Sequence, residues 1–91
     1  MTKRYRFAPG SIVATPAALA VTTSTQLREV LERHLTGDWG CVSTEDAQAN
    51  EDAVTHGCRV FSVYQLTDST KVWLITEADR ASTCFLLPAD Y

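Results

Sequence analysis

The sequence predicts an α+β domain, in which two to three N-terminal helices pack on one face of a three- to four-stranded antiparallel sheet. Three observations lead to this fold. The last third of the chain is a series of strand-like runs separated by short turns. The middle of the chain repeats apolar residues at helical spacing. The 91 residues are 45% hydrophobic, which suits a single domain over residues 1–91 with its own core.

The first part of this domain is expected to be a basic N-terminal segment, residues 1–10, with the cations Lys3, Arg4 and Arg6. It ends in the turn pair Pro9-Gly10. The β-branched residues of 11–15 then predict a short strand, which we expect as the fourth strand of the sheet. Thr15-Pro16 predicts the N-cap and first position of a one- or two-turn helix, because proline is preset for that position.

Two further helices are expected within the mainly helical part, residues 11–57. The first begins at a capping box over 23–26, and its apolar stripe is formed by Leu27, Val30, Leu31 and Leu35. His34 falls on the same stripe, and Gly37 marks the end. Ser43 then caps a helix with an acidic first turn, which ends at Gly57.

The remaining residues, 58–91, predict a β-meander. Strand-like runs cover 58–67, 71–77 and 83–87, and polar turns separate them. Each run is rich in β-branched and aromatic residues, which favour a pleated, half-buried surface. We therefore expect three consecutive antiparallel strands.

Several polar side chains are candidates for chemistry or for structural roles. His34 is conceivable as a general acid or base, and its alternative is a partly buried histidine at the rim of the core. If the chain is an enzyme, the candidate catalytic residues are His34, Arg59 and Arg80. Asn50 sits where an apolar residue is expected and, with Asp79 and Arg80, is interpreted as a structural polar residue.

The charge distribution favours a different function. No Lys or Arg lies between Arg33 and Arg59, whereas this interval holds five of the eleven acidic residues. Such a surface suits a basic partner, and Trp39 is either an anchor for its loop or part of the same surface. The candidate partner-binding residues are Asp38, Trp39, Glu45, Asp46, Glu51 and Asp52. The net charge of −3 argues against direct binding of nucleic acid.

Other classes of protein find no support in the sequence. The longest apolar runs fall far short of the ~20 residues of a membrane helix. The three cysteines, 41, 58 and 84, are widely spaced and match no zinc motif, so we expect reduced thiols in a cytoplasmic protein. We expect no metal and no cofactor.

Four segments carry a resemblance to a group of known proteins: Arg33-His34, 37–40, 73–80 and 86–88. With these segments, the chain from Arg6 to Tyr91 resembles small proteins of bacterial plasmids and integrative elements, some of them labelled plasmid-related. The resemblance implies an origin in a mobile genetic element and no particular activity. The order of elements alone is similar to the RelE/ParE toxin fold. That likeness implies His34, Arg59 and Arg80, with Ser62 or Tyr64, as the residues to test in a metal-independent ribonuclease.

These observations lead us to expect a small non-catalytic interaction protein of a mobile element. Its acidic helical region would bind a basic surface of a nucleic-acid-handling or host-defence complex, as an anti-CRISPR-like inhibitor does. The first alternative is the ribonuclease-like or toxin-like enzyme. The second is a structural or accessory protein that forms a homodimer through an uncovered face or edge of its sheet.

Overall fold

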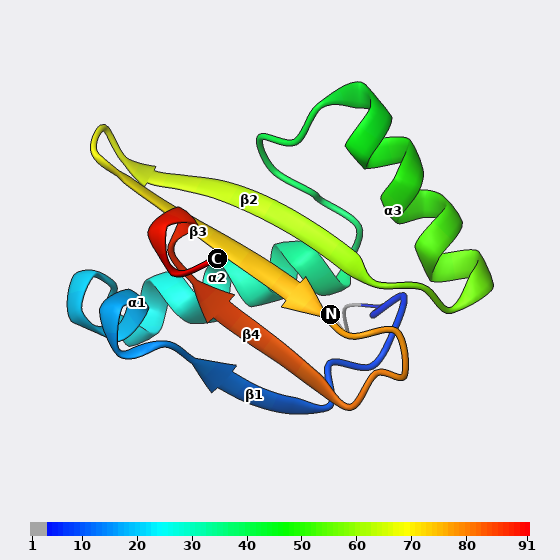
Figure 1. The fold of residues 1–91 in the computed structure, drawn as a ribbon, viewed down its shortest axis with the longest axis horizontal. Coiled ribbons are helices and arrows are strands. Elements are labelled where there is room, and N and C mark those ends of the chain that lie inside the picture. The colour runs from blue at the N-terminus through cyan, green and yellow to red at the C-terminus, as the bar shows by residue number, and fades with distance from the viewer. Residues whose placement is uncertain (1–3) are drawn as a thin grey trace.

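The computed structural model describes residues 4–91, so the first three residues of the basic N-terminal segment lie outside it. The fold is α+β, with three helices before the last three strands and a four-stranded sheet (Figure 1). In chain order the elements are β1 (Ser11–Ala14), α1 (Pro16–Val21), α2 (Ser24–Leu35), α3 (Thr44–His56), β2 (Val60–Thr67), β3 (Thr70–Thr76), β4 (Ser82–Leu86) and the short 3₁₀ helix η1 (Pro88–Asp90).

The sheet is mixed, which corrects the prediction of a purely antiparallel sheet. Its strand order is β1-β4-β3-β2. The three C-terminal strands form the predicted antiparallel meander, but β1 pairs parallel to β4. Hydrogen bonds from Ser11 N to Ala81 O, 3.0 Å, and from Thr15 N to Phe85 O, 2.9 Å, mark the two ends of this ladder. The residue pattern of a strand does not encode its direction, which is set by the long connection through the helices.

The three helices begin at the caps that the sequence predicts. The Thr15 hydroxyl accepts from Ala18 N at 3.1 Å, before α1. At α2, Thr23 and Gln26 form a capping box, with each side chain accepting from the other residue's backbone N–H. Ser43 caps α3, which ends at Gly57 in the left-handed conformation.

The main core lies between α2 and one face of the sheet. Alternation along the strands directs Tyr64, Leu74 and Phe85 into this layer, where they pack with Val30 of α2 and are all at most 3% exposed. In contrast to α2, α3 lies outside the edge strand β2 (Figure 1), so the helices do not all share one face of the sheet.

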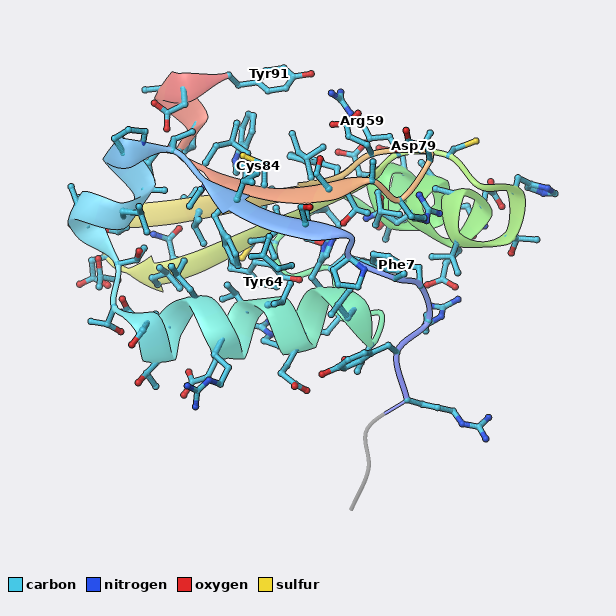
Figure 2. The ribbon with its side chains drawn as sticks, turned by 90° about the horizontal axis from the view of Figure 1, so that it is seen from below. Phe7, Arg59, Tyr64, Asp79, Cys84 and Tyr91 are labelled. Carbon is cyan, nitrogen blue, oxygen red and sulfur yellow. The ribbon has the colours of Figure 1, made fainter. Side chains whose placement is uncertain are left out.

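Within residues 4–91, no long helix covers the opposite face of the sheet. The chain end, η1 and Tyr91, lies on this side, and α2 lies on the other (Figure 2). Phe61 and Trp73 project here, with their rings 5.0 Å apart and edge to face. The two faces of the sheet therefore differ: one is sealed by α2, and the other is covered only by the end of the described chain.

Candidate functional site

His34 lies at the centre of a buried chain of hydroxyl groups between α2 and the sheet. Its Nδ1 is 2.6 Å from the Ser62 hydroxyl, and its Nε2 is 2.8 Å from the Thr76 hydroxyl. Thr76 is 2.7 Å from Thr83, which donates to Pro9 O at 2.8 Å. The four side chains that form it are all fully buried: His34 of α2, Ser62 of β2, Thr76 of β3 and Thr83 of β4.

Counting protons along this chain determines the state of the imidazole. Thr83 donates to a carbonyl, so its oxygen must accept from Thr76, and Thr76 must in turn accept from His34 Nε2–H. Nδ1 is then left to accept from Ser62. Burial, together with the nearby charge of Arg80, lowers the pKa of His34 to about 4. His34 is a neutral, structurally engaged residue at neutral pH.

Aromatic rings close the space around the imidazole. Phe7 meets His34 edge to face at 5.2 Å between ring centroids, and Trp39 does so at 6.2 Å. The guanidinium of Arg80 lies over the Phe7 ring, 5.4 Å from its centroid. The imidazole thus has aromatic and hydroxyl neighbours and no exposure to solvent.

The two candidate catalytic arginines do not join His34 in one cleft. Arg80 adopts a positive φ of 60° and donates to backbone carbonyls, including Ala53 O at 3.0 Å and Glu77 O at 3.1 Å. It thereby ties the end of α3 to the turn before β4. Arg59 lies on the opposite face of the sheet, where it contacts the Tyr91 hydroxyl at 3.3 Å and Glu77 at 3.6 Å.

The other residues considered for catalysis are also engaged. Ser62 belongs to the buried chain of hydroxyl groups around His34, and the Tyr64 hydroxyl donates to Asp38 O at 2.7 Å. Burial raises the pKa of Tyr64 well above its usual value. Asp79 accepts from Ala81 N at 2.9 Å within its own turn.

Three of the six predicted partner-binding residues contact side chains outside their own helix or loop. Asp38 pairs with Arg33 at 2.7 Å, and Glu51 pairs with Arg6 at 2.8 Å. Each ion pair lowers the pKa of its carboxyl group. Trp39 is only 6% exposed and donates from Nε1 to Glu51 at 3.0 Å, so it anchors its loop.

The other three, Glu45, Asp46 and Asp52, are exposed on α3. Asp52 accepts from Gln48 on the same helix at 3.3 Å, and no cation pairs with any of the three within residues 4–91. We call these three side chains the α3 acidic face. Because no Lys or Arg lies between 33 and 59, the helix brings no cation of its own to neutralise them.

Asn50 fixes α3 against the sheet, a role for which its position on the inner stripe is the sequence signal. Its amide accepts from Phe61 N at 3.0 Å and donates to Phe61 O at 2.6 Å, as a neighbouring strand would do. The loop before α3 continues this cover. Val63 N donates to Trp39 O at 3.2 Å, and Cys41 N donates to Val63 O at 2.7 Å. The free edge of β2 is thereby covered at Phe61 and Val63.

The open face of the sheet holds a groove that sequence reasoning missed. It encloses about 260 Å³ and is lined by Arg59, Phe61, Trp73, Ile75 and Tyr91. The alternation of large residues along the predicted strands was its only signal, and the contribution of Tyr91 had none. Trp73 and Tyr91 are 5.4 Å apart between ring centroids, so the rings already contact one another.

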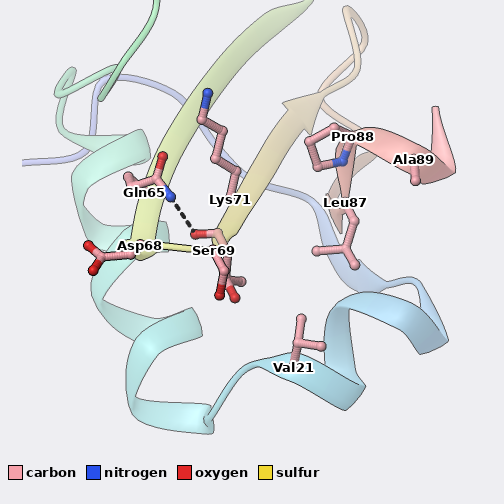
Figure 3. A pocket seen from close by; sticks show the side chains of 9 residues that line it. Val21, Gln65, Asp68, Ser69, Lys71, Leu87, Pro88 and Ala89 are labelled. Atoms are coloured by element: carbon pink, nitrogen blue, oxygen red, sulfur yellow. Dashed lines mark hydrogen bonds between the residues drawn. The ribbon is translucent and has the colours of Figure 1, made fainter.

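A second hollow, of about 470 Å³, lies between the end of α1, the β2–β3 turn and η1 (Figure 3). Gln65 lines it and donates to two backbone carbonyls of the turn. Asp68 and Lys71 point away from each other in Figure 3, so they do not converge on one ligand atom.

Comparison of the chain with protein-family models, with curated proteins and with solved structures found no match. Among residues 4–91, no group of three His, Cys, Asp or Glu side chains has an arrangement that could hold a metal ion. No helix in the same range is long and apolar enough to cross a membrane.

Proposed function

We propose that the chain is a small non-catalytic interaction protein that binds a basic partner through the α3 acidic face, Glu45, Asp46 and Asp52. The observation that carries this proposal is the exposure of these three carboxylates on a helix that Asn50 fixes to the sheet. Carboxylates without local cations create a negative potential, which steers and orients a positively charged surface.

The internal contacts of the histidine and of one arginine considered for catalysis support a non-catalytic role. His34 is buried within its chain of hydroxyl groups, and the Arg80 guanidinium donates hydrogen bonds to four backbone carbonyls. Arg59 faces the other side of the sheet from Ser62 and His34. A general acid or base must reach the reacting group, and these positions do not offer that reach.

The partner class follows from the charge of the surface. A cationic groove that normally holds phosphates is the kind of protein surface that an acidic helix fits. Such grooves occur in nucleic-acid-handling and host-defence complexes, and the resemblance to plasmid-related proteins points to the same setting, with an anti-CRISPR-like inhibitor as one form. Direct nucleic-acid binding is disfavoured because the net charge of the chain is −3.

The test compares two variants that change net charge equally. Glu45→Lys with Asp52→Lys alters the α3 acidic face, whereas Glu29→Lys with Asp68→Lys alters exposed acids elsewhere. Glu51 is left intact because its reversal would break the contacts with Arg6 and Trp39. The tagged wild type and both variants are used to capture partners from a bacterial lysate, with mass spectrometry and then binding isotherms for each captured protein.

We expect a basic protein that the wild type and the Glu29/Asp68 variant bind alike and that the Glu45/Asp52 variant loses. Circular dichroism spectra of both variants verify that the helix content of the wild type is retained. A partner that tolerates the α3 reversal, or that is lost equally with both variants, would contradict the proposal.

A further inference from the structure

Strand β1 is the uncovered edge of the sheet. Within residues 4–91 it pairs with β4 on one side only, and no labelled element lies beyond it in Figure 1. Ser11 N donates to Ala81 O and Thr15 N donates to Phe85 O, so the alternation of the ladder directs the peptide groups of Ile12 and Ala14 away from the sheet. Between residues 4 and 91, no backbone hydrogen bond outside the ladder reaches either residue.

The two edge strands of this sheet differ in how far their outward backbone groups are covered. Asn50 and the loop at Gly40 satisfy the outward peptide groups of Phe61 and Val63 in β2. By contrast, β1 has the sequence Ser-Ile-Val-Ala, without a charge, a proline or a bulge that would oppose pairing. Its side chains Ile12 and Val13 are 47% and 46% exposed and lie on opposite faces of the strand. The edge combines unpaired backbone with apolar side chains.

The occupant that best fits this edge is another β1. Its outward peptide groups, at Ile12 and Ala14, are placed symmetrically about Val13, so two antiparallel copies complement each other. The strand is uncharged, and therefore two copies can meet without repulsion between their strands even though each chain carries a net charge of −3. Pairing with a strand of a different protein would not require outward peptide groups placed symmetrically about Val13.

We propose that two copies of this chain form a homodimer by antiparallel pairing of β1 with β1 about a two-fold axis at Val13. Ile12 of one copy exchanges both backbone hydrogen bonds with Ala14 of the other. Val13 then lies opposite its own counterpart at a non-hydrogen-bonded position, where Cα atoms are about 4.5 Å apart and side chains meet closely. The pairing does not depend on the proposed role of the α3 acidic face.

The dimer would have one continuous sheet built from the four strands of each copy. Both α2 helices would cover one face, and both grooves at Phe61 and Trp73 would open on the other. Because only four residues of each copy form the ladder, we expect reversible association that depends on protein concentration.

The position of Val13 on the axis allows a test by opposite charges. Val13→Lys and Val13→Glu are each expected to be monomeric in sedimentation equilibrium, because like charges would face each other across the axis. Their equimolar mixture is expected to form the dimer again. Val21→Lys is the matched control, since Val21 is also a valine, is 49% exposed and lies away from the β1 edge. It should dimerise as the wild type does.

Hydrogen exchange of the wild type provides a measurement that needs no variant. The amides of Ile12 and Ala14 should become protected as protein concentration rises, while that of the exposed-loop residue Ser69 should not change. The proposal is overturned by a wild type that stays monomeric up to its solubility limit, by single Val13 variants that still dimerise, or by exchange at Ile12 and Ala14 that is independent of concentration.

Discussion

Protonation of His34 should make the fold sensitive to mild acid. In the folded protein the pKa of His34 is about 4, against a usual value of 6.5. Between these two values the unfolded chain binds a proton that the folded chain does not. The contribution of His34 to stability is therefore fully present above about pH 6.5 and is lost as the pH falls towards 4.

The size of the effect follows from the two pKa values. From about pH 7 to about pH 5, the linkage relation gives a loss of about 2 kcal/mol in the free energy of unfolding. The paired carboxyl groups of Asp38 and Glu51 have lowered pKa values, so they stay ionised in the folded state over this range. The contribution of these two carboxyl groups to stability is lost only below about pH 4, the usual range of carboxyl groups. His34 therefore dominates the change in the free energy of unfolding between about pH 7 and about pH 5.

The perturbation is His34→Gln, since glutamine retains one donor and one acceptor but cannot gain a proton. Urea unfolding followed by the fluorescence of Trp39 and Trp73 gives the free energy at each pH. The variant should be less stable than the wild type at about pH 7 but lose much less stability on going to about pH 5. His56→Gln, at an exposed position, should behave like the wild type.

Two outcomes would refute this reasoning. The first is a wild type whose free energy of unfolding is unchanged between about pH 7 and about pH 5. The second is a His34→Gln variant that loses as much stability over this range as the wild type. In either case the imidazole would not be held neutral by the buried hydroxyl chain.

Two further predictions concern the covered edge of β2. Asn50→Leu should lower the free energy of unfolding by about 1–3 kcal/mol, because the Phe61 N–H and C=O lose their partners, and amide exchange at Phe61 should accelerate. Unaltered exchange at Phe61 would argue against this role. Gly40→Ala should lower the melting temperature more than Gly57→Ala does: both glycines have positive φ, near 70°, but only at Gly40 would a Cβ collide with the Val63 carbonyl oxygen. Equal effects of the two substitutions would show that the loop does not need its close approach to β2.

Much of the fold could be predicted because its signals are local. The caps at Thr15, Thr23 and Ser43 each satisfy a backbone donor within three residues, and the apolar periodicities of α2 and the meander lie within single elements. The order of the three α-helices and the four strands followed from these signals.

The candidate site was less predictable, because its contacts join distant residues. His34 meets Ser62 and Thr76 across 28 and 42 residues, and Arg6 meets Glu51 across 45. The acidic interval was visible in the sequence as a charge pattern. The contacts that hold the predicted partner-binding residues Asp38, Trp39 and Glu51 within the fold were not visible.

The sequence by itself determined an α+β chain with a short first strand, then its helices, then its meander, and an acidic interval between two arginines. Only the tertiary structure decided that β1 joins β4 in parallel and remains an open edge, that α3 lies beside β2, and that His34 is neutral and enclosed. The physical reason is that hydrogen bonds and periodicity within an element depend on neighbouring residues. Strand direction, burial and the pairing of charges depend instead on which distant segments the folded chain brings together.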